Sequence, residues 1–183
     1  MPRYLLFFLI MPVLSLANML MLGQALANQP AFIFPQTYYF IEDDKPSYAI
    51  PLNNRANWQQ AIFNGLKRSD EVLWVQTDFE IKTPIKTPAG VFVSVLGSFD
   101  AYWDGEYIGS NGKVGNSKNT EIPGIIDKTL LIPQALSVEG KHTLSLRIST
   151  QHNPANQQSV PFYAVVSEYD FLIQVPYKRA SLP

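Results

Sequence analysis

The middle of the chain alternates between apolar and polar residues with the two-residue period of β-strands. The alternation is strongest over residues 71–81. One predicted face carries Leu73, Val75, Thr77, Phe79 and Ile81, and the other carries Trp74, Gln76, Asp78 and Glu80. Residues 141–150 alternate in the same way, whereas residues 91–96 are almost continuously apolar, which is typical of a strand buried on both faces. These patterns predict a sheet with one face in a core.

An Asp-Gly pair lies between two short alternating runs in residues 99–109. It predicts a two-residue β-hairpin turn at Asp104 and Gly105, because glycine adopts positive φ freely and aspartate tolerates it. Opposed residues of a hairpin share a face. We therefore expect Phe99, Ala101, Trp103, Glu106 and Ile108 on one face, and Asp100, Tyr102 and Tyr107 on the other, with the tyrosines paired.

The other predicted elements complete an all-β pattern. Strands are expected at residues 37–41 and 129–132, a short helix at 57–67, one helical turn at 133–136, and one or two strands in 161–175, while 110–127 is irregular. Seven or eight strands separated by turn residues predict a single β-sandwich domain spanning residues 28–177.

The first 27 residues have the pattern of an export signal. A basic start that includes Arg3 precedes an apolar run from Tyr4 to about Leu22, and Ala25-Leu26-Ala27 matches a cleavage site. Cleavage after Ala27 is expected, and an uncleaved anchor is the alternative because the run is long. The expected location is the periplasm or the outer face of the inner membrane. A basic tail at residues 178–183 resembles segments that lie beside membrane spans.

Composition argues against several classes of function. Residues 28–183 carry 13 basic and 15 acidic side chains, giving a net charge of about −2 without the basic surplus that binds nucleic acid. The chain has no cysteine, and its two histidines, His142 and His152, lack zinc-site spacing. No nucleophile elbow or P-loop motif occurs. We therefore predict no catalytic residue, no metal and no cofactor.

A ligand site is predicted around the hairpin and the irregular segment after it. Trp103 flanks the turn, where its ring can be partly exposed, and the segment supplies polar groups from Asn111, Asn116, Lys118 and Glu121. An aromatic face with amides and carboxylates suits a small polar ligand such as a sugar. The alternative is that Trp103 caps the core and the loop is only solvated. Trp58 and Trp74 are expected in the core.

Strand and turn motifs between residues 73 and 148 carry a family resemblance. They are Trp74-Val75-Gln76-Thr77-Asp78-Phe79, residues 91–96, 102–109, 111–112, 121–124, 131–133 and 140–148. The segment resembles the galactose-binding-like jelly roll found in sugar-binding domains of some glycoside hydrolases. It is more similar to the exported N-terminal sensory domains of bacterial seven-helix receptors, histidine kinases and diguanylate cyclases.

The resemblance implies a non-catalytic sensory domain that recognises a small polar ligand outside the inner membrane. It also implies a membrane-bound signalling partner, or a transmembrane region C-terminal to the domain. Two alternatives stay open: a stand-alone exported structural or protein-interaction module, and an accessory carbohydrate-binding domain of a glycoside hydrolase.

Overall fold

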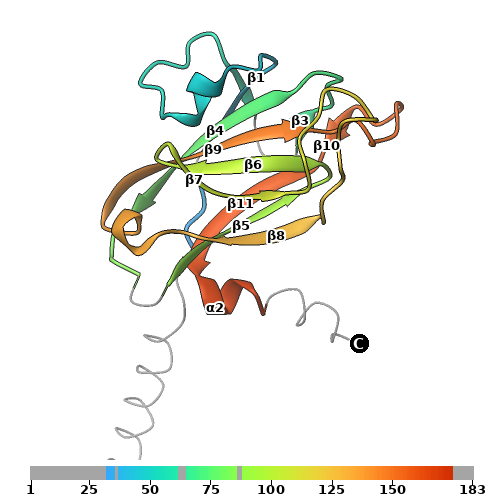
Figure 1. Ribbon diagram of the computed structural model, residues 1–183. Helices are drawn as coiled ribbons and strands as arrows, with labels where there is room; N and C mark the ends of the chain where they lie inside the picture. Colours follow the sequence, from blue (N-terminus) through green and yellow to red (C-terminus); the bar gives the residue numbers. More distant parts are fainter. Residues whose placement is uncertain (1–31, 36, 62–64, 86–87, 175–183) are drawn as a thin grey trace, which may run out of the picture. The chain divides into compact units, whose positions relative to one another are not determined.

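A computed structural model describes residues 32–35, 37–61, 65–85 and 88–174 (Figure 1). The predicted export signal, the basic tail and part of the predicted helix at 57–67 lie outside these residues. Within the described residues, no helix combines the length and apolar character needed to cross a membrane.

The described strands form two main antiparallel sheets, as the all-β sandwich prediction requires. The larger sheet has the order β2-β1-β4-β9-β6-β7, and the smaller one has the order β11-β5-β8. The bounds in the larger sheet are β1 Tyr38–Ile41, β2 Gln59–Ala61, β4 Leu73–Ile81, β6 Ser98–Trp103, β7 Glu106–Asn111 and β9 Gly140–Ser149. Those in the smaller sheet are β5 Ala89–Val95, β8 Asp127–Leu131 and β11 Phe162–Glu168.

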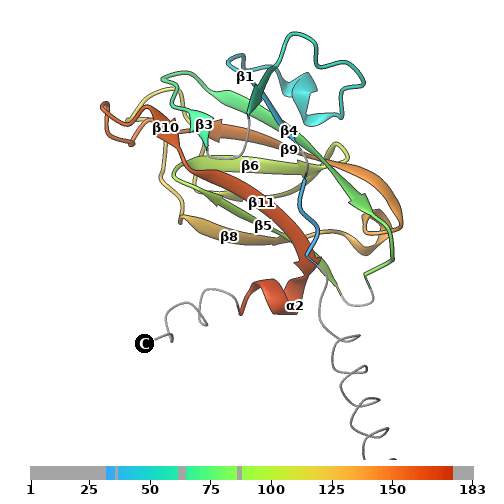
Figure 2. The same ribbon diagram turned by 180° about the vertical axis from the view of Figure 1, so that it is seen from behind.

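The remaining elements are short. β3 (Leu66–Lys67) and β10 (Ser159–Val160) form a two-stranded ribbon, η1 (Pro46–Ala49) and η2 (Gln134–Leu136) are 3-10 turns, and α2 (Tyr169–Leu172) follows β11. The chain crosses from the larger to the smaller sheet between β4 and β5 and between β7 and β8, and it returns between β5 and β6 and between β8 and β9. β6 and β7 form a hairpin within the larger sheet (Figures 1 and 2).

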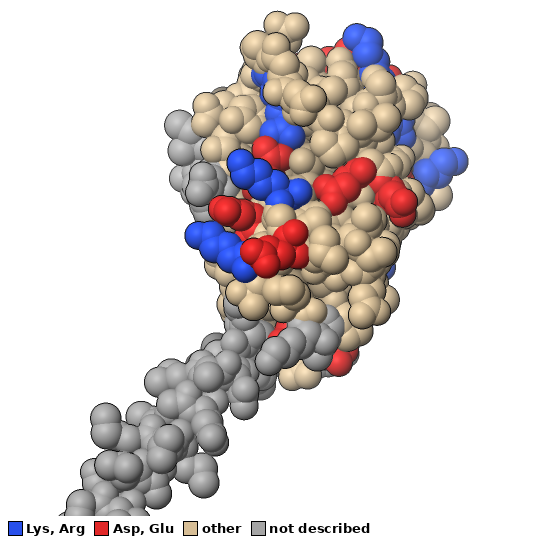
Figure 3. Space-filling model, turned by 90° about the vertical axis from the view of Figure 1, so that its left-hand side faces the viewer, with Lys and Arg blue, Asp and Glu red and all other residues tan. Residues whose placement is uncertain are grey.

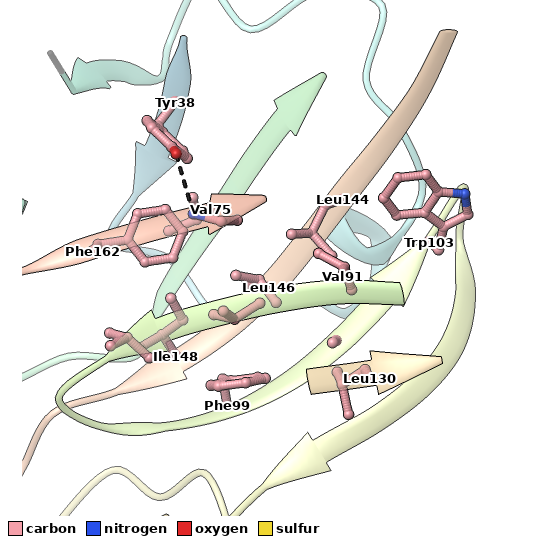
Figure 4. Packing of buried hydrophobic residues seen from close by; sticks show 14 of the residues in the cluster. Tyr38, Val75, Val91, Phe99, Trp103, Leu130, Leu144, Leu146, Ile148 and Phe162 are labelled. Atoms are coloured by element: carbon pink, nitrogen blue, oxygen red, sulfur yellow. Dashed lines mark hydrogen bonds between the residues drawn. The ribbon is translucent and has the colours of Figure 1, made fainter. Parts of the chain in front are cut away.

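The core fills the space between the two sheets with the residues that the alternation predicted (Figure 4). Val75, Leu144 and Leu146 from the larger sheet and Val91 from the smaller sheet are fully buried there. Tyr38 links the two layers, because its hydroxyl oxygen accepts a hydrogen bond from the backbone N–H of Ala164 at 3.2 Å. Burial raises the pKa of the Tyr38 phenol. The central apolar layer is therefore what fixes the two sheets face to face.

β5 is buried on both faces, as its apolar sequence predicted. Val91, Val93 and Val95 face the central core, while Phe92 packs with Leu172 of α2 on the opposite side. Helix α2 lies in a stretch for which only strands were predicted. A single turn of helix gives too little periodicity to be recognised in the sequence.

The predicted hairpin is confirmed at β6 and β7. Asp104 and Gly105 have φ values of 54° and 91°, and Tyr102 pairs with Tyr107. The register shifts beyond this pair, where Ala101 lies opposite Gly109. This bulge adds one residue to β7, an irregularity that alternation alone does not reveal.

The predicted helix at residues 57–67 is wrong. Its described parts include β2 and β3, and β2 is the edge strand that pairs with β1, where Gln60 lies opposite Tyr39. Gly65 has a φ of 131°, and a Cβ there would lie 2.6 Å from the carbonyl oxygen of Val160. Pairing with distant strands therefore outweighs the weak helical spacing of a few apolar residues.

Candidate binding site

Trp103 is fully buried instead of partly exposed. Its indole N–H donates to the carbonyl oxygen of Leu136 at 2.9 Å, and its ring stacks on His142 with centroids 5.5 Å apart. Trp103 therefore caps the core, as the alternative has it, and its ring offers no exposed face to a ligand.

Asn111 and Glu121 hold the irregular segment, residues 112–126, against the sandwich. The Asn111 amide donates to the carbonyl oxygen of Ile125 at 2.6 Å and accepts from its N–H at 3.0 Å. Glu121 accepts from the backbone N–H of Gln151 at 2.7 Å and from the hydroxyl of Ser98 at 3.4 Å. Both residues are at least 95% buried. Their polar groups therefore bond to other parts of the domain and stabilise the fold.

Asn116 and Lys118 are exposed in the same segment, where Asn116 accepts a hydrogen bond from the Thr120 hydroxyl at 3.2 Å. Trp103 lies at the other end of β6, next to the turn, whereas Glu121 contacts Ser98 at the start of that strand. The two ends of β6 are five residue-to-residue steps apart, which is about 16 Å. The structure therefore does not bring the five predicted residues together as one site.

A different group of side chains gathers on the outer face of the larger sheet, the face directed away from the core. Arg147 of β9 lies between Trp74 of β4 and Asp100 of β6 in the strand register. Tyr102 lies two residues beyond Asp100 along β6, and it pairs with Tyr107 of β7. We call these five residues, Trp74, Asp100, Tyr102, Tyr107 and Arg147, the outer-face cluster.

Aromatic rings run in sequence across this face. The centroid distances are 5.1 Å from Trp58 to Tyr48, 6.2 Å from Tyr48 to Trp74, 5.7 Å from Trp74 to Tyr102, and 5.6 Å from Tyr102 to Tyr107. Trp74 is buried and Trp58 is partly buried, but both lie outside the central core, so the expectation that they belong to it is wrong. Tyr107 is 58% exposed and ends the row. The row therefore presents aromatic surface to solvent at its β7 end.

Charged groups lie beside the rings. Arg147 donates to both carboxylate oxygens of Asp44 at 2.6 Å each, and it approaches Asp100 at 3.5 Å. The hydrogen bonds from Arg147 hold the pKa of Asp44 below its usual value, and those to Asp44 raise the pKa of Arg147. Two carboxylates share one guanidinium, so these three groups carry one net negative charge.

Residues 42–58, which we call the strap, cover the β1 and β4 part of the outer face. The fully buried Gln76 side chain donates to the carbonyl oxygens of Tyr48 and Ile50 at 2.8 Å each, and it accepts from Arg55 at 2.9 Å. Arg55 also makes a bidentate ion pair with Asp78 at 2.6 and 2.8 Å. Burial favours a higher pKa for Asp78, but hydrogen bonds, first from Arg55, outweigh it and lower that pKa. The strap is thus fastened to β4.

The side of the molecule seen in Figure 3 carries charged side chains of both signs, with no large patch of one sign. Lys and Arg side chains lie among Asp and Glu side chains across the middle of this view. Such a mixed surface is unlike the basic stripe that neutralises a phosphate backbone.

Sequence reasoning did not select the outer-face cluster as a site, although the signal was present. The alternation placed Trp74, Asp100, Tyr102 and Tyr107 on the face opposite the core. Large aromatic residues on the polar side of a strand are the feature that would have pointed to this face. Arg147 follows the same rule in residues 141–150.

No protein-family model matches the sequence, and a search of curated proteins found no match. Among solved structures, the chain is similar to a Bacteroides uniformis β-glucuronidase at 10% identity and a TM-score of 0.54, covering 76% of this chain and 18% of that one. A β-glucuronidase from an uncultured Clostridium gives 10% identity and a TM-score of 0.53, covering 77% and 29%. A Ruminococcus gnavus β-glucuronidase in complex with uronic deoxynojirimycin gives 10% and 0.51, covering 78% and 29%.

These similarities establish a shared β-sandwich fold. The chain spans less than a third of the length of each of these enzymes.

Proposed function

We propose that this chain is an exported, non-catalytic carbohydrate-recognition domain, and that its site is the open part of the outer face. The observation that carries the proposal is the exposed Tyr107 ring next to Tyr102, with Asp100 and Arg147 beside them. A sugar ring stacks its apolar face on an aromatic side chain, and its hydroxyls donate to carboxylates and accept from guanidinium groups. Similarity to parts of β-glucuronidases supports an accessory role of this kind.

The charge arrangement favours a neutral sugar over an acidic one. Asp44 occupies one edge of the Arg147 guanidinium with two short hydrogen bonds, and Asp100 lies near the remaining nitrogen. An incoming carboxylate would have to displace one of these acids and meet the net negative charge of the group. Hydroxyl groups can use Asp100 and Arg147 without displacing either.

The carboxylates near the hairpin support a non-catalytic role. Asp104 accepts from the backbone N–H of Thr143 at 2.8 Å and contacts the His142 ring nitrogen at 2.6 Å. The Glu121 side chain is buried, and its carboxylate accepts hydrogen bonds from the Gln151 N–H and the Ser98 hydroxyl. Hydrolysis of a chromogenic glycoside or ester that is lost on Glu121→Gln substitution would overturn this part of the proposal.

Binding is tested by a thermal-shift screen of neutral and acidic saccharides, followed by calorimetric titration of each ligand that stabilises the protein. Tyr107→Ala is expected to weaken binding about 2–10-fold through loss of one aromatic contact. Lys118→Ala, at an exposed residue of the 112–126 segment, is the control and is expected to leave the affinity unchanged. Unchanged affinity in Tyr107→Ala, with a loss in Lys118→Ala, would place the site on the segment.

A second candidate function is the sensory domain of a membrane signalling protein. The strap favours it, because a segment clamped beside the site by Gln76 is an element whose position a ligand could bias. Sensing requires a coupled membrane protein. The measurement is co-purification of the chain with such a protein from the native membrane, with and without sugar. A copurified amount that changes when sugar is added would favour this candidate over the first.

A further inference from the structure

β8 is the outermost strand on one side of the smaller sheet, and its free edge faces away from β5 (Figures 1 and 2). Just before β8, the carbonyl oxygen of Ile126 accepts from the N–H of Val95 at 3.0 Å. Residues of an antiparallel pair bond across the ladder at every second position, so the even-numbered residues of β8 bond to β5. The odd-numbered residues, Asp127, Thr129 and Leu131, direct their backbone N–H and C=O groups toward the free edge.

The free edge of β8 is open at these three positions. Among the described residues, no hydrogen bond reaches their outward backbone groups. The opposite edge of the same sheet differs, because Ile33 makes two hydrogen bonds with Val166 of β11 there, at 2.8 and 3.0 Å. The Asn111 side chain likewise bonds both backbone groups of Ile125, just before β8. The outward groups of β8 itself are therefore a template for another strand.

The side chains along the edge are apolar at both ends. Leu130 packs in the central core, so Asp127, Thr129 and Leu131 lie on the outer face of the smaller sheet. Leu131 is 50% exposed, and Ile125, which precedes β8, is 60% exposed. Between them lies the hydroxyl of the partly buried Thr129. Such an edge can gain both backbone hydrogen bonds and apolar contacts from a second strand.

We propose that the free edge of β8 is a homodimer interface, where β8 pairs antiparallel with β8 of a second copy about a two-fold axis at Thr129. In this register Thr129 lies opposite Thr129 of the other copy, and Asp127 lies opposite Leu131. Each of these pairs exchanges two backbone hydrogen bonds. The Thr–Thr pair stabilises the contact further, and Leu131 of one copy reaches the exposed Ile125 of the other along the diagonal.

Charge favours this register and a second copy as the occupant. An axis at Lys128 would place two lysines opposite each other, and an axis at Asp127 would place two aspartates opposite each other, which destabilises a strand pair. An axis at Leu130 or Leu131 would bring Pro133, which has no N–H, into the pairing. With the axis at Thr129, every outward residue pairs and no like charges face each other. A two-fold antiparallel pair is self-complementary and needs no other protein.

The test is sedimentation velocity of the full chain from micromolar to millimolar concentration. Thr129→Lys and Thr129→Glu each place like charges across the axis, and each is expected to raise the dimer dissociation constant about 2–30-fold. An equimolar mixture of the two variants places opposite charges there and is expected to restore the dimer. Asn156→Lys and Asn156→Glu, at an exposed residue of the loop before β10, are the matched controls and are expected to dimerise as the wild-type protein does.

The short pairing buries less area than a stable interface, so the dimer is expected in the upper part of the concentration range. A wild-type protein that stays monomeric throughout would overturn the proposal, and so would a dimer that both Thr129 variants leave unchanged. Dimer loss in both variants without recovery in the mixture would also overturn it.

Hydrogen exchange of the wild-type protein gives a second readout that requires no substitution. The outward amides of Thr129 and Leu131 are expected to exchange more slowly as the concentration rises, because they become bonded in the dimer. Exchange at these amides that does not change with concentration would contradict the proposal. The pairing uses no residue of the outer-face cluster, so its outcome is independent of sugar binding.

Discussion

Replacing Gln76 with leucine tests how the strap is held on the sheet. Leucine fills a similar volume but leaves the carbonyl oxygens of Tyr48 and Ile50 without the Gln76 donor. It also leaves the Leu52 N–H and the Nε–H of Arg55 without the Gln76 acceptor. A buried polar group without a partner costs about 1–3 kcal/mol. These partners are only partly buried, so water can reach some of them once the strap lifts. The combined loss is therefore about 2–4 kcal/mol.

For a domain of this size, that loss lowers the melting temperature by about 4–16 °C. The measurement is thermal unfolding by circular dichroism, paired with limited trypsin digestion that reports cleavage after Arg55 in the strap. Gln76→Leu is expected to melt earlier and to be cut faster at Arg55. Gln134→Leu is the matched control, because Gln134 is exposed and its substitution leaves the strap intact. A Gln76→Leu protein with wild-type melting and wild-type digestion would refute the clamping role of Gln76.

Three further predictions concern the turn, the ion pairs and the buried acid. Gly105→Val forces a β-branched residue to a φ of 91° and should cost about 1–3 kcal/mol, seen as a lower melting temperature; an unchanged value would mean that the turn tolerates side chains. Asp44 and Asp78 have folded-state pKa values below the ordinary 3.8, so the stability they contribute is present above that value and is lost as pH falls through the lower folded values. The melting temperature should therefore fall as the pH is lowered from neutral to pH ~3, and it should fall less steeply in an Asp78→Asn variant. The same pH dependence in the variant and the wild-type protein would contradict this prediction. Glu121→Ala leaves the buried Gln151 N–H without its acceptor and should destabilise the whole domain by about 1–3 kcal/mol in chemical denaturation, whereas a purely ligand-contacting residue would leave stability unchanged.

The fold could be predicted because its main signals are local. Strict alternation over residues 71–81 corresponds to β4, and the Asp104-Gly105 pair specifies a turn whose positive φ values few other pairs accept. The helix predicted at 57–67 failed because β2 and β3 are stabilised by pairing with distant strands. Such long-range pairing leaves no periodic trace in a segment of two or three residues.

The site was harder to predict than the fold, because it depends on which face each aromatic residue occupies and on what covers that face. Trp103 was selected for its position beside the turn, yet the same alternation places it on the core side with Phe99. Tyr102 and Tyr107 were correctly placed on the opposite side. The strap could not be foreseen, because its contact with Gln76 joins residues more than 20 positions apart through irregular backbone.

The location of the sugar site is tested most directly by nuclear magnetic resonance of the ¹⁵N-labelled chain, titrated with a saccharide that stabilises it. The account predicts that the backbone amide shifts concentrate at Asp100, Tyr102, Tyr107 and Arg147, which adjoin one another on β6, β7 and β9. Shifts confined to residues 112–126, with the outer face unaffected, would contradict it and would move the site to the irregular segment.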